Sequence, residues 1–64
     1  MHGYTTNLKK ILLAHGCHFK RAGKGDHEIW YSPITGISFP VDHDIKSRHL
    51  ANAVLKQAGL PKLF

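Results

Sequence analysis

His27 stands at the end of a short basic and glycine-rich segment, and its position suits proton-transfer chemistry. The segment Arg21-Ala22-Gly23-Lys24-Gly25-Asp26 is typical of a tight turn, and the run Glu28-Ile29-Trp30-Tyr31 is dense in the aromatic and β-branched residues of strands. His27 is therefore predicted where a mobile turn becomes rigid sheet. There, strand packing can hold the imidazole ring while a ligand approaches it over the small glycines.

Three cations, Lys20, Arg21 and Lys24, surround this histidine in the sequence. They would attract an anion, and they would lower the fraction of imidazolium at neutral pH, which leaves a neutral nitrogen able to take a proton. These residue types suit chemistry on a phosphate backbone. From the residues alone, a strand-initiating histidine in an ordinary β-turn is the simpler interpretation.

The composition predicts one small, basic domain. Nine Lys and Arg against four Asp and Glu give a formal charge of +5 and a pI near 9.7. A field of this sign favours nucleic acid as partner, then an acidic protein, then a membrane surface. Residues 1–64 are expected to form a single domain, which buries only about 60% of its unfolded surface.

Cysteine content and hydropathy predict a cytoplasmic protein without a membrane partner. Cys17 is the sole cysteine, so no intramolecular disulfide can form, which fits a reducing compartment. No apolar run approaches membrane-spanning length, and residues 1–6 lack the basic and apolar regions of a signal peptide.

An amphipathic helix is predicted near each end of the chain. The first spans residues 6–15, begins at a threonine cap (Thr5 or Thr6) and stops at Gly16. Its apolar stripe consists of Leu8, Ile11 and Leu12. The second spans residues 48–58, and its stripe consists of Leu50, Ala51, Val54, Leu55 and Ala58.

The second helix has clear boundary signals. Ser47 is the expected cap, and Gly59 with Pro61 is the expected stop. The tail after Pro61 is expected either to dock through its apolar end or to fray.

Three strands are predicted between the helices, at residues 17–22, 27–32 and 37–41. Short turns join them, so an antiparallel meander is expected, and Pro40 places the third strand at an edge or near its end. Alternation assigns an apolar side to the sheet, formed by Cys17, Phe19, Ile29, Tyr31, Ile37, Phe39 and Val41. The other side is expected to be polar and basic, apart from Trp30.

The order α-β-β-β-α predicts an α+β fold with a three-stranded antiparallel sheet and two helices on one face. Double-stranded-RNA-binding domains share this architecture, and they contact RNA mainly through shape, phosphate and 2′-hydroxyl groups.

Three motifs resemble one protein family more closely than the general architecture does. The element Lys24-Gly25-Asp26-His27-Glu28-Ile29-Trp30-Tyr31, the strand end Phe39-Pro40-Val41, and the helix end Leu55-Lys56-Gln57-Ala58-Gly59-Leu60 resemble the HicA toxins of bacterial toxin-antitoxin systems. The resemblance runs from the first helix to Leu60. It implies a fold like that of a double-stranded-RNA-binding domain, cleavage of mRNA, and inhibition by a HicB-type antitoxin.

The resemblance also implies a catalytic residue. The family's essential histidine lies two positions after a glycine at the start of the second strand, which here is His27 after Gly25. Family members often carry serine or glycine between the two, whereas this chain has Asp26, so His27 is left open as acid or as base. Lys24, with Lys20 or Arg21, is expected to hold phosphate oxygens.

No metal or other cofactor is expected, because RNA supplies its own nucleophile in the 2′-hydroxyl. Gly23 and Gly25 are expected to let the backbone approach the phosphate and to offer N–H groups. The group His15-Gly16-Cys17-His18 contains metal-ligating types, but zinc sites draw on separated ligand pairs. Cys17 is more simply a small buried hydrophobe.

Several alternatives stay open. The chain could be a non-catalytic RNA-binding module of the same fold, or a domain whose basic face meets an acidic protein. Trp30 could stack on an unpaired base, or it could be covered by a partner or by a long neighbour such as Lys20. Asp42-His43-Asp44 could bind a cation or assist catalysis, but a solvated loop is the simpler interpretation.

Overall fold

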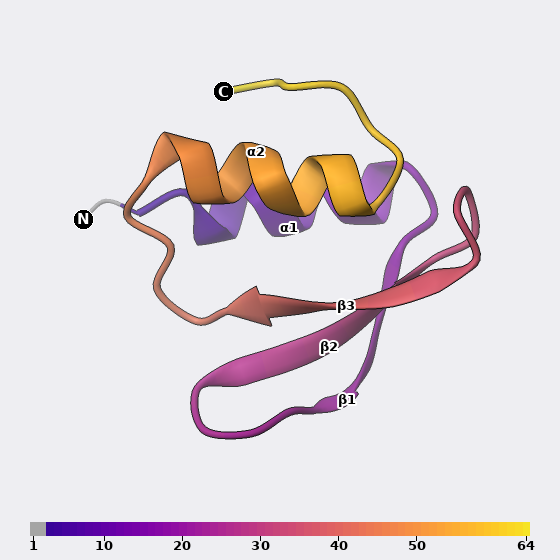
Figure 1. The fold of residues 1–64 in the computed structure, drawn as a ribbon, viewed down its shortest axis with the longest axis horizontal. Helices are drawn as coiled ribbons and strands as arrows, with labels where there is room; N and C mark the ends of the chain where they lie inside the picture. Colours follow the sequence, from indigo (N-terminus) through magenta and orange to yellow (C-terminus); the bar gives the residue numbers. More distant parts are fainter. Residues whose placement is uncertain (1–2) are drawn as a thin grey trace.

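The computed structural model describes residues 3–64; Met1 and His2, part of the segment expected to lack a targeting signal, lie outside the described residues. The elements are α1 (Thr5–Ala14), β1 (His18–Ala22), β2 (His27–Ser32), β3 (Ile37–Asp42) and α2 (Arg48–Gln57). The strands form an antiparallel sheet in the order β1-β2-β3, with both helices on the same side (Figure 1). The predicted fold class is confirmed, and it is consistent with a double-stranded-RNA-binding-domain-like fold. No helix between residues 3 and 64 is long and apolar enough to cross a membrane.

Both helices end at the predicted glycines. Gly16 and Gly59 adopt φ angles of +88° and +84°, which glycine reaches without steric cost. The amide after each glycine donates to the carbonyl five residues back, at 2.9 Å from Cys17 and 2.8 Å from Leu60. This hydrogen-bond pattern satisfies carbonyls that the last helical turn leaves unpaired.

The helix starts differ from one another. The Ser47 hydroxyl accepts from the amides of His49 and Leu50 at 3.1 and 3.4 Å, as a helix cap does. The threonine cap predicted for α1 is wrong, because Tyr4 occupies the N-cap position. The Thr5 hydroxyl accepts instead from the Ile45 amide at 2.8 Å, which ties the start of α1 to the loop before α2.

The predicted apolar side of the sheet is wrong for β2, whereas Phe19 of β1 lies on the predicted side, opposite Trp30. Ser32 pairs with Ile37 and Trp30 pairs with Phe39, so even-numbered residues of β2 lie on the same side as odd-numbered residues of β3. We call the side against the helices the helix-covered face; it consists of Phe19, Glu28, Trp30, Ser32, Ile37, Phe39 and Val41. The other side is the open face, and it consists of His18, Lys20, Arg21, His27, Ile29, Tyr31, Ser38, Pro40 and Asp42.

Trp30 is therefore a core residue and not a surface one. Only 4% of its area is exposed, and its indole N–H donates to a Glu28 carboxylate oxygen at 2.9 Å. The rest of the buried cluster is apolar and consists of Leu8, Leu12, Cys17, Phe39, Val41, Ile45, Ala51, Val54, Leu55 and Ala58. Burial of Cys17 is confirmed.

One buried side chain, Ser32 of β2, ties the sheet to the end of α2. The buried Ser32 hydroxyl donates to the Ala58 carbonyl at 2.7 Å and accepts from the Ile34 amide at 3.2 Å, so its hydrogen-bonding groups are satisfied on the helix-covered face.

The C-terminal tail docks on the helices. The Asn52 side chain of α2 hydrogen-bonds both the amide and the carbonyl of Phe64. The Phe64 ring packs edge-on against Tyr4, with the ring centroids 5.2 Å apart.

β1 lies farthest from the helices (Figure 1), and all five of its residues are exposed. Phe19 pairs with Trp30 but is 50% exposed, because β1 extends beyond the helix layer. A bulge between Phe19 and Arg21 shifts the register, and it places both Lys20 and Arg21 on the open face. β3 is an edge strand, as Pro40 predicted.

Candidate active site

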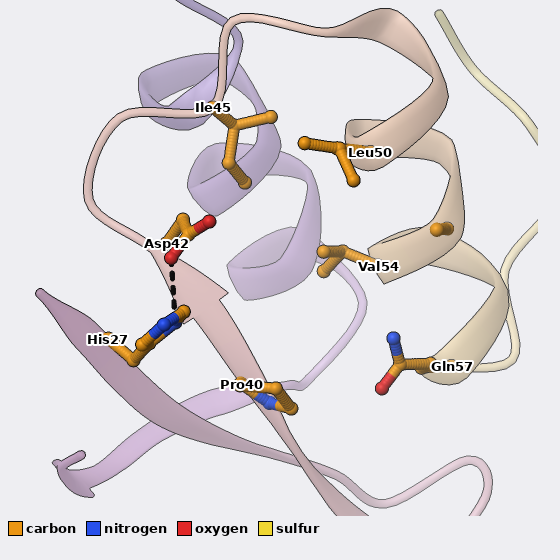
Figure 2. Close-up of a pocket in the computed structure, with 8 residues that line it drawn as sticks. His27, Pro40, Asp42, Ile45, Leu50, Val54 and Gln57 are labelled. Atoms are coloured by element: carbon orange, nitrogen blue, oxygen red, sulfur yellow. Dashed lines mark ion pairs between the residues drawn. The ribbon is translucent and has the colours of Figure 1, made fainter. Parts of the chain in front are cut away.

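His27 lies on the open face, where it contacts Asp42. The two residues are direct cross-strand partners in β2 and β3, so their side chains project from the same face beside each other. Nδ1 of His27 lies 2.6 Å from Oδ1 of Asp42, and the side chains are 47% and 45% exposed (Figure 2). The ring is thus both oriented by a carboxylate and accessible from solvent.

This contact determines what the imidazole can do. When Nδ1–H donates to the carboxylate, the neutral ring carries its free lone pair on Nε2. A histidine oriented in this way takes a proton at Nε2 and returns it in the same place. The charged group in contact with the ring is a carboxylate, whereas the surrounding charges expected from the sequence were cations.

A cleft of about 150 Å³ lies next to this pair, at the edge of the sheet where α2 packs beside the edge strand β3, so that residues of the open face and of α2 both reach it (Figure 2). His27, Pro40 and Asp42 line it from the sheet, and Ile45 lines it from the loop. The helix contributes Leu50, Ala53, Val54 and Gln57. Leu50, predicted as a core residue, is 53% exposed at this cleft. The site therefore combines a polar pair with an apolar wall.

The basic residues predicted for the site fall into two groups. Lys20 and Arg21 are exposed on the open face; the Lys20 ammonium donates to the Ser38 hydroxyl at 3.2 Å, and Arg21 pairs with Ile29, two positions along β2 from His27. Lys24 is exposed in the turn between β1 and β2, and its carbonyl accepts from the His27 amide at 3.2 Å.

The two glycines of this turn have different roles. Gly25 adopts a φ of +61°, and a Cβ placed on it would meet no atom of the described residues within 4 Å, so its backbone is open to a ligand. Gly23 is not free in this way: its amide donates to the His27 carbonyl at 2.8 Å, and a Cβ there would lie 3.1 Å from that oxygen. The expectation that Gly23 offers its N–H to an anion is wrong.

Glu28, the residue after His27, lies on the helix-covered face of the sheet. Its carboxylate accepts from the Trp30 indole at 2.9 Å, lies 3.1 Å from the Lys9 ammonium and 3.6 Å from Nε2 of His43. The Trp30 hydrogen bond lowers the pKa of Glu28; partial burial opposes this, and Lys9 and His43 add to the lowering. Glu28 is a structural anion beneath the site, and it leaves Asp42 as the carboxylate that faces His27.

Among residues 3–64, the histidines other than His27 do not converge on this site. His15 hydrogen-bonds the Ile11 carbonyl of its own helix at 2.9 Å, whereas His18 packs against Tyr31 on the open face. Within residues 3–64, the structure contains no group of three or more side chains arranged to hold a metal ion.

Asp42 is the site residue to which sequence reasoning gave too little weight. The solvated loop predicted at Asp42-His43-Asp44 begins one residue later, because Asp42 is the last residue of β3. The available signal was the four-residue turn at 33–36. Counting outward from the Ser32–Ile37 pair brings residue 42 opposite residue 27.

The fold and the site define a class: a small basic α-β-β-β-α protein, consistent with the architecture of double-stranded-RNA-binding domains, that carries an exposed histidine–carboxylate pair. A family model described as the HicA toxin of bacterial toxin-antitoxin systems matches residues 6–60. The chain therefore belongs to the HicA toxin family. Comparison with curated proteins and with solved structures gives no match.

Proposed function

We propose that this chain is an mRNA-cleaving ribonuclease, a cytoplasmic single-domain toxin whose activity a HicB-type antitoxin suppresses. The observation that carries the proposal is the contact of 2.6 Å between His27 and Asp42 on an exposed, positively charged sheet face. Membership of the HicA toxin family supports the same activity and implies an antitoxin partner.

The proposed reaction uses the nucleophile of RNA itself. The 2′-oxygen attacks the adjacent phosphorus, the P–O5′ bond breaks, and the products are a 2′,3′-cyclic phosphate and a 5′-hydroxyl. One proton must leave the 2′-oxygen and one must reach the 5′-oxygen. His27 transfers one of these protons at Nε2, while Asp42 holds the ring and so acts as a positioning residue.

The phosphate would be held by basic side chains and by the turn. Lys20 and Arg21 flank the open face, and Lys24 with the open backbone of Gly25 lies at the start of β2. Positive charge near the equatorial oxygens stabilises the additional negative charge of the transition state. These four residues bind and orient the substrate, and the proton transfer falls to His27.

The reaction is expected to proceed without a divalent metal. We expect the purified protein to cleave RNA in excess EDTA and to leave 2′,3′-cyclic phosphate ends, which mass spectrometry of the fragments detects. Strict dependence on added Mg²⁺, or 5′-phosphate products, would contradict the mechanism. Intact RNA at high protein concentration would favour the non-catalytic binding module.

Asp42→Asn tests the positioning role. A charge-assisted hydrogen bond contributes about 1.5–3 kcal/mol, but this pair is nearly half exposed and is screened by solvent. We therefore expect kcat to fall roughly tenfold, the equivalent of about 1.4 kcal/mol, with little change in KM. Steady-state cleavage of a labelled RNA in excess over the protein measures both constants.

Two further variants make this test specific. Asp42→Glu keeps a carboxylate within reach of the ring and should recover part of the lost kcat. Asp44→Asn is the matched control, because Asp44 lies 3.4 Å from Lys46 on the exposed loop and has no contact with the ring in the described structure. Equal losses in the Asp42 and Asp44 variants would show that only net charge matters.

A further inference from the structure

The open face carries an aromatic pair that the proposed cleavage chemistry does not use. Tyr31 and His18 are direct cross-strand partners in β2 and β1. Their ring centroids lie 5.5 Å apart, with the planes tilted by 42°. His18 is exposed and Tyr31 is partly buried, and both helices lie on the other side of the sheet (Figure 1). The pair is thus a ring surface directed toward solvent.

Cations accompany this pair. Lys20 and Arg21 project from the same face, and Lys20 extends across β2 to the hydroxyl of Ser38, the residue that pairs with Tyr31 on its other side. Among the strand residues that form the open face, Asp42 carries the one carboxylate that the structure describes, and it is in contact with His27. Charge complementarity therefore favours a polyanion on this face.

The aromatic pair and the candidate active site belong to one continuous strip. His27, Ile29 and Tyr31 alternate along β2 and project from the same face. At about 3.3 Å per residue, His27 lies roughly 13 Å from Tyr31. Partly buried Ile29 lies between them, next to Arg21. A bound chain that follows β2 would pass from the rings to the imidazole without leaving the face.

We propose that this strip binds single-stranded RNA, with an unpaired base stacked on Tyr31 and His18 and with the backbone held by Lys20 and Arg21. The proposal rests on the proposed nuclease function of His27, and it specifies the substrate as unpaired RNA. Stacking requires a free base face, and in a duplex both faces of each base are already covered by its neighbours. The fold is thus similar to that of double-stranded-RNA-binding domains, but the ligand that we propose is a single strand.

The test measures binding separately from cleavage, in the full chain carrying His27→Ala. Fluorescence anisotropy compares a short labelled RNA strand with the same strand annealed to its complement. The single strand should bind more tightly. Tyr31→Ala should weaken single-strand binding roughly 5- to 150-fold and leave duplex binding unchanged, whereas Tyr31→Phe should retain it. A 2-aminopurine base in the strand should lose fluorescence on binding, and Tyr31→Ala should abolish that loss.

Two further variants distinguish a loss of RNA binding from a loss of folding. Leu13→Ala is the matched control, since Leu13 is 58% exposed on α1, away from the open face. His18→Ala supplies a second variant on the exposed strand β1 in case Tyr31→Ala is unfolded by circular dichroism. Duplex binding as tight as single-strand binding, or single-strand binding unchanged in both variants, overturns the proposal. Loss of antitoxin binding by Tyr31→Ala with RNA affinity intact overturns it too, and would assign the strip to a protein partner.

Failure of this proposal can be distinguished from failure of the proposed function. Single-strand preference that depends on Tyr31, together with cleavage that survives His27→Ala, would support the stacking strip and refute the catalytic role of His27. Cleavage that requires His27, together with equal affinity for single strand and duplex, would refute the strip and leave the nuclease proposal standing.

Discussion

His27→Ala should lower the rate of RNA cleavage by about 10²- to 10⁴-fold, which is the range for loss of a positioned general acid or base. The side chain is 47% exposed and projects from the open face, so its removal leaves the buried cluster unchanged. Thermal unfolding followed by circular dichroism should therefore give a midpoint close to that of the unaltered chain. Toxicity on induced expression should disappear, while binding to the antitoxin should persist.

The matched control for this experiment is His49→Ala. His49 is an exposed histidine at the start of α2, and the Ser47 cap uses its backbone amide and not its ring. The double variant of His27→Ala with Asp42→Asn adds a second check. Because Asp42 acts through the ring, its substitution should cost little more once the ring is absent. Additive losses would mean that the two residues do not act as a unit, and undiminished cleavage by His27→Ala would end the assignment.

The order and limits of the elements followed from local signals. Gly16, Gly59 and Ser47 mark helix ends through backbone conformation and capping, and these are properties of a few adjacent residues. The strand limits followed from turns that contain glycine and proline. The residues that end an element act locally, so sequence reasoning located them to within one residue.

The side of the sheet that is buried depends on register, which local alternation does not determine. Ile29 and Tyr31 have the same period as Trp30 and Ser32, so either set could face the helices. The four-residue turn decides between them, since it aligns Trp30 with Phe39. The same register brings His27 against Asp42, so one error in assigning faces also concealed the site's carboxylate. The β1 bulge, which presents both Lys20 and Arg21, had no comparable signal in the sequence.

The corrected register has a large consequence for Trp30. Trp30→Ala should destabilise the fold by about 3–5 kcal/mol, the usual cost of removing a buried large aromatic side chain. Trp30 is 4% exposed, and its indole also satisfies the carboxylate of Glu28. A domain of this size has roughly 3–10 kcal/mol of total stability, so a large part of it would be lost. Urea unfolding followed by far-ultraviolet circular dichroism measures the change.

A surface role for Trp30 predicts a different outcome. If the indole served to stack on RNA or to contact the antitoxin, Trp30→Ala would bind more weakly but unfold at the same urea concentration as the unaltered chain. Phe19→Ala is the matched control, because Phe19 is an aromatic residue paired with Trp30 in the sheet and yet is 50% exposed. Its loss should cost far less than that of Trp30, since few of its atoms leave water when the chain folds. Trp30→Phe should restore much of the stability by refilling most of the space, and the part that it fails to restore reflects the smaller ring together with the lost hydrogen bond to Glu28.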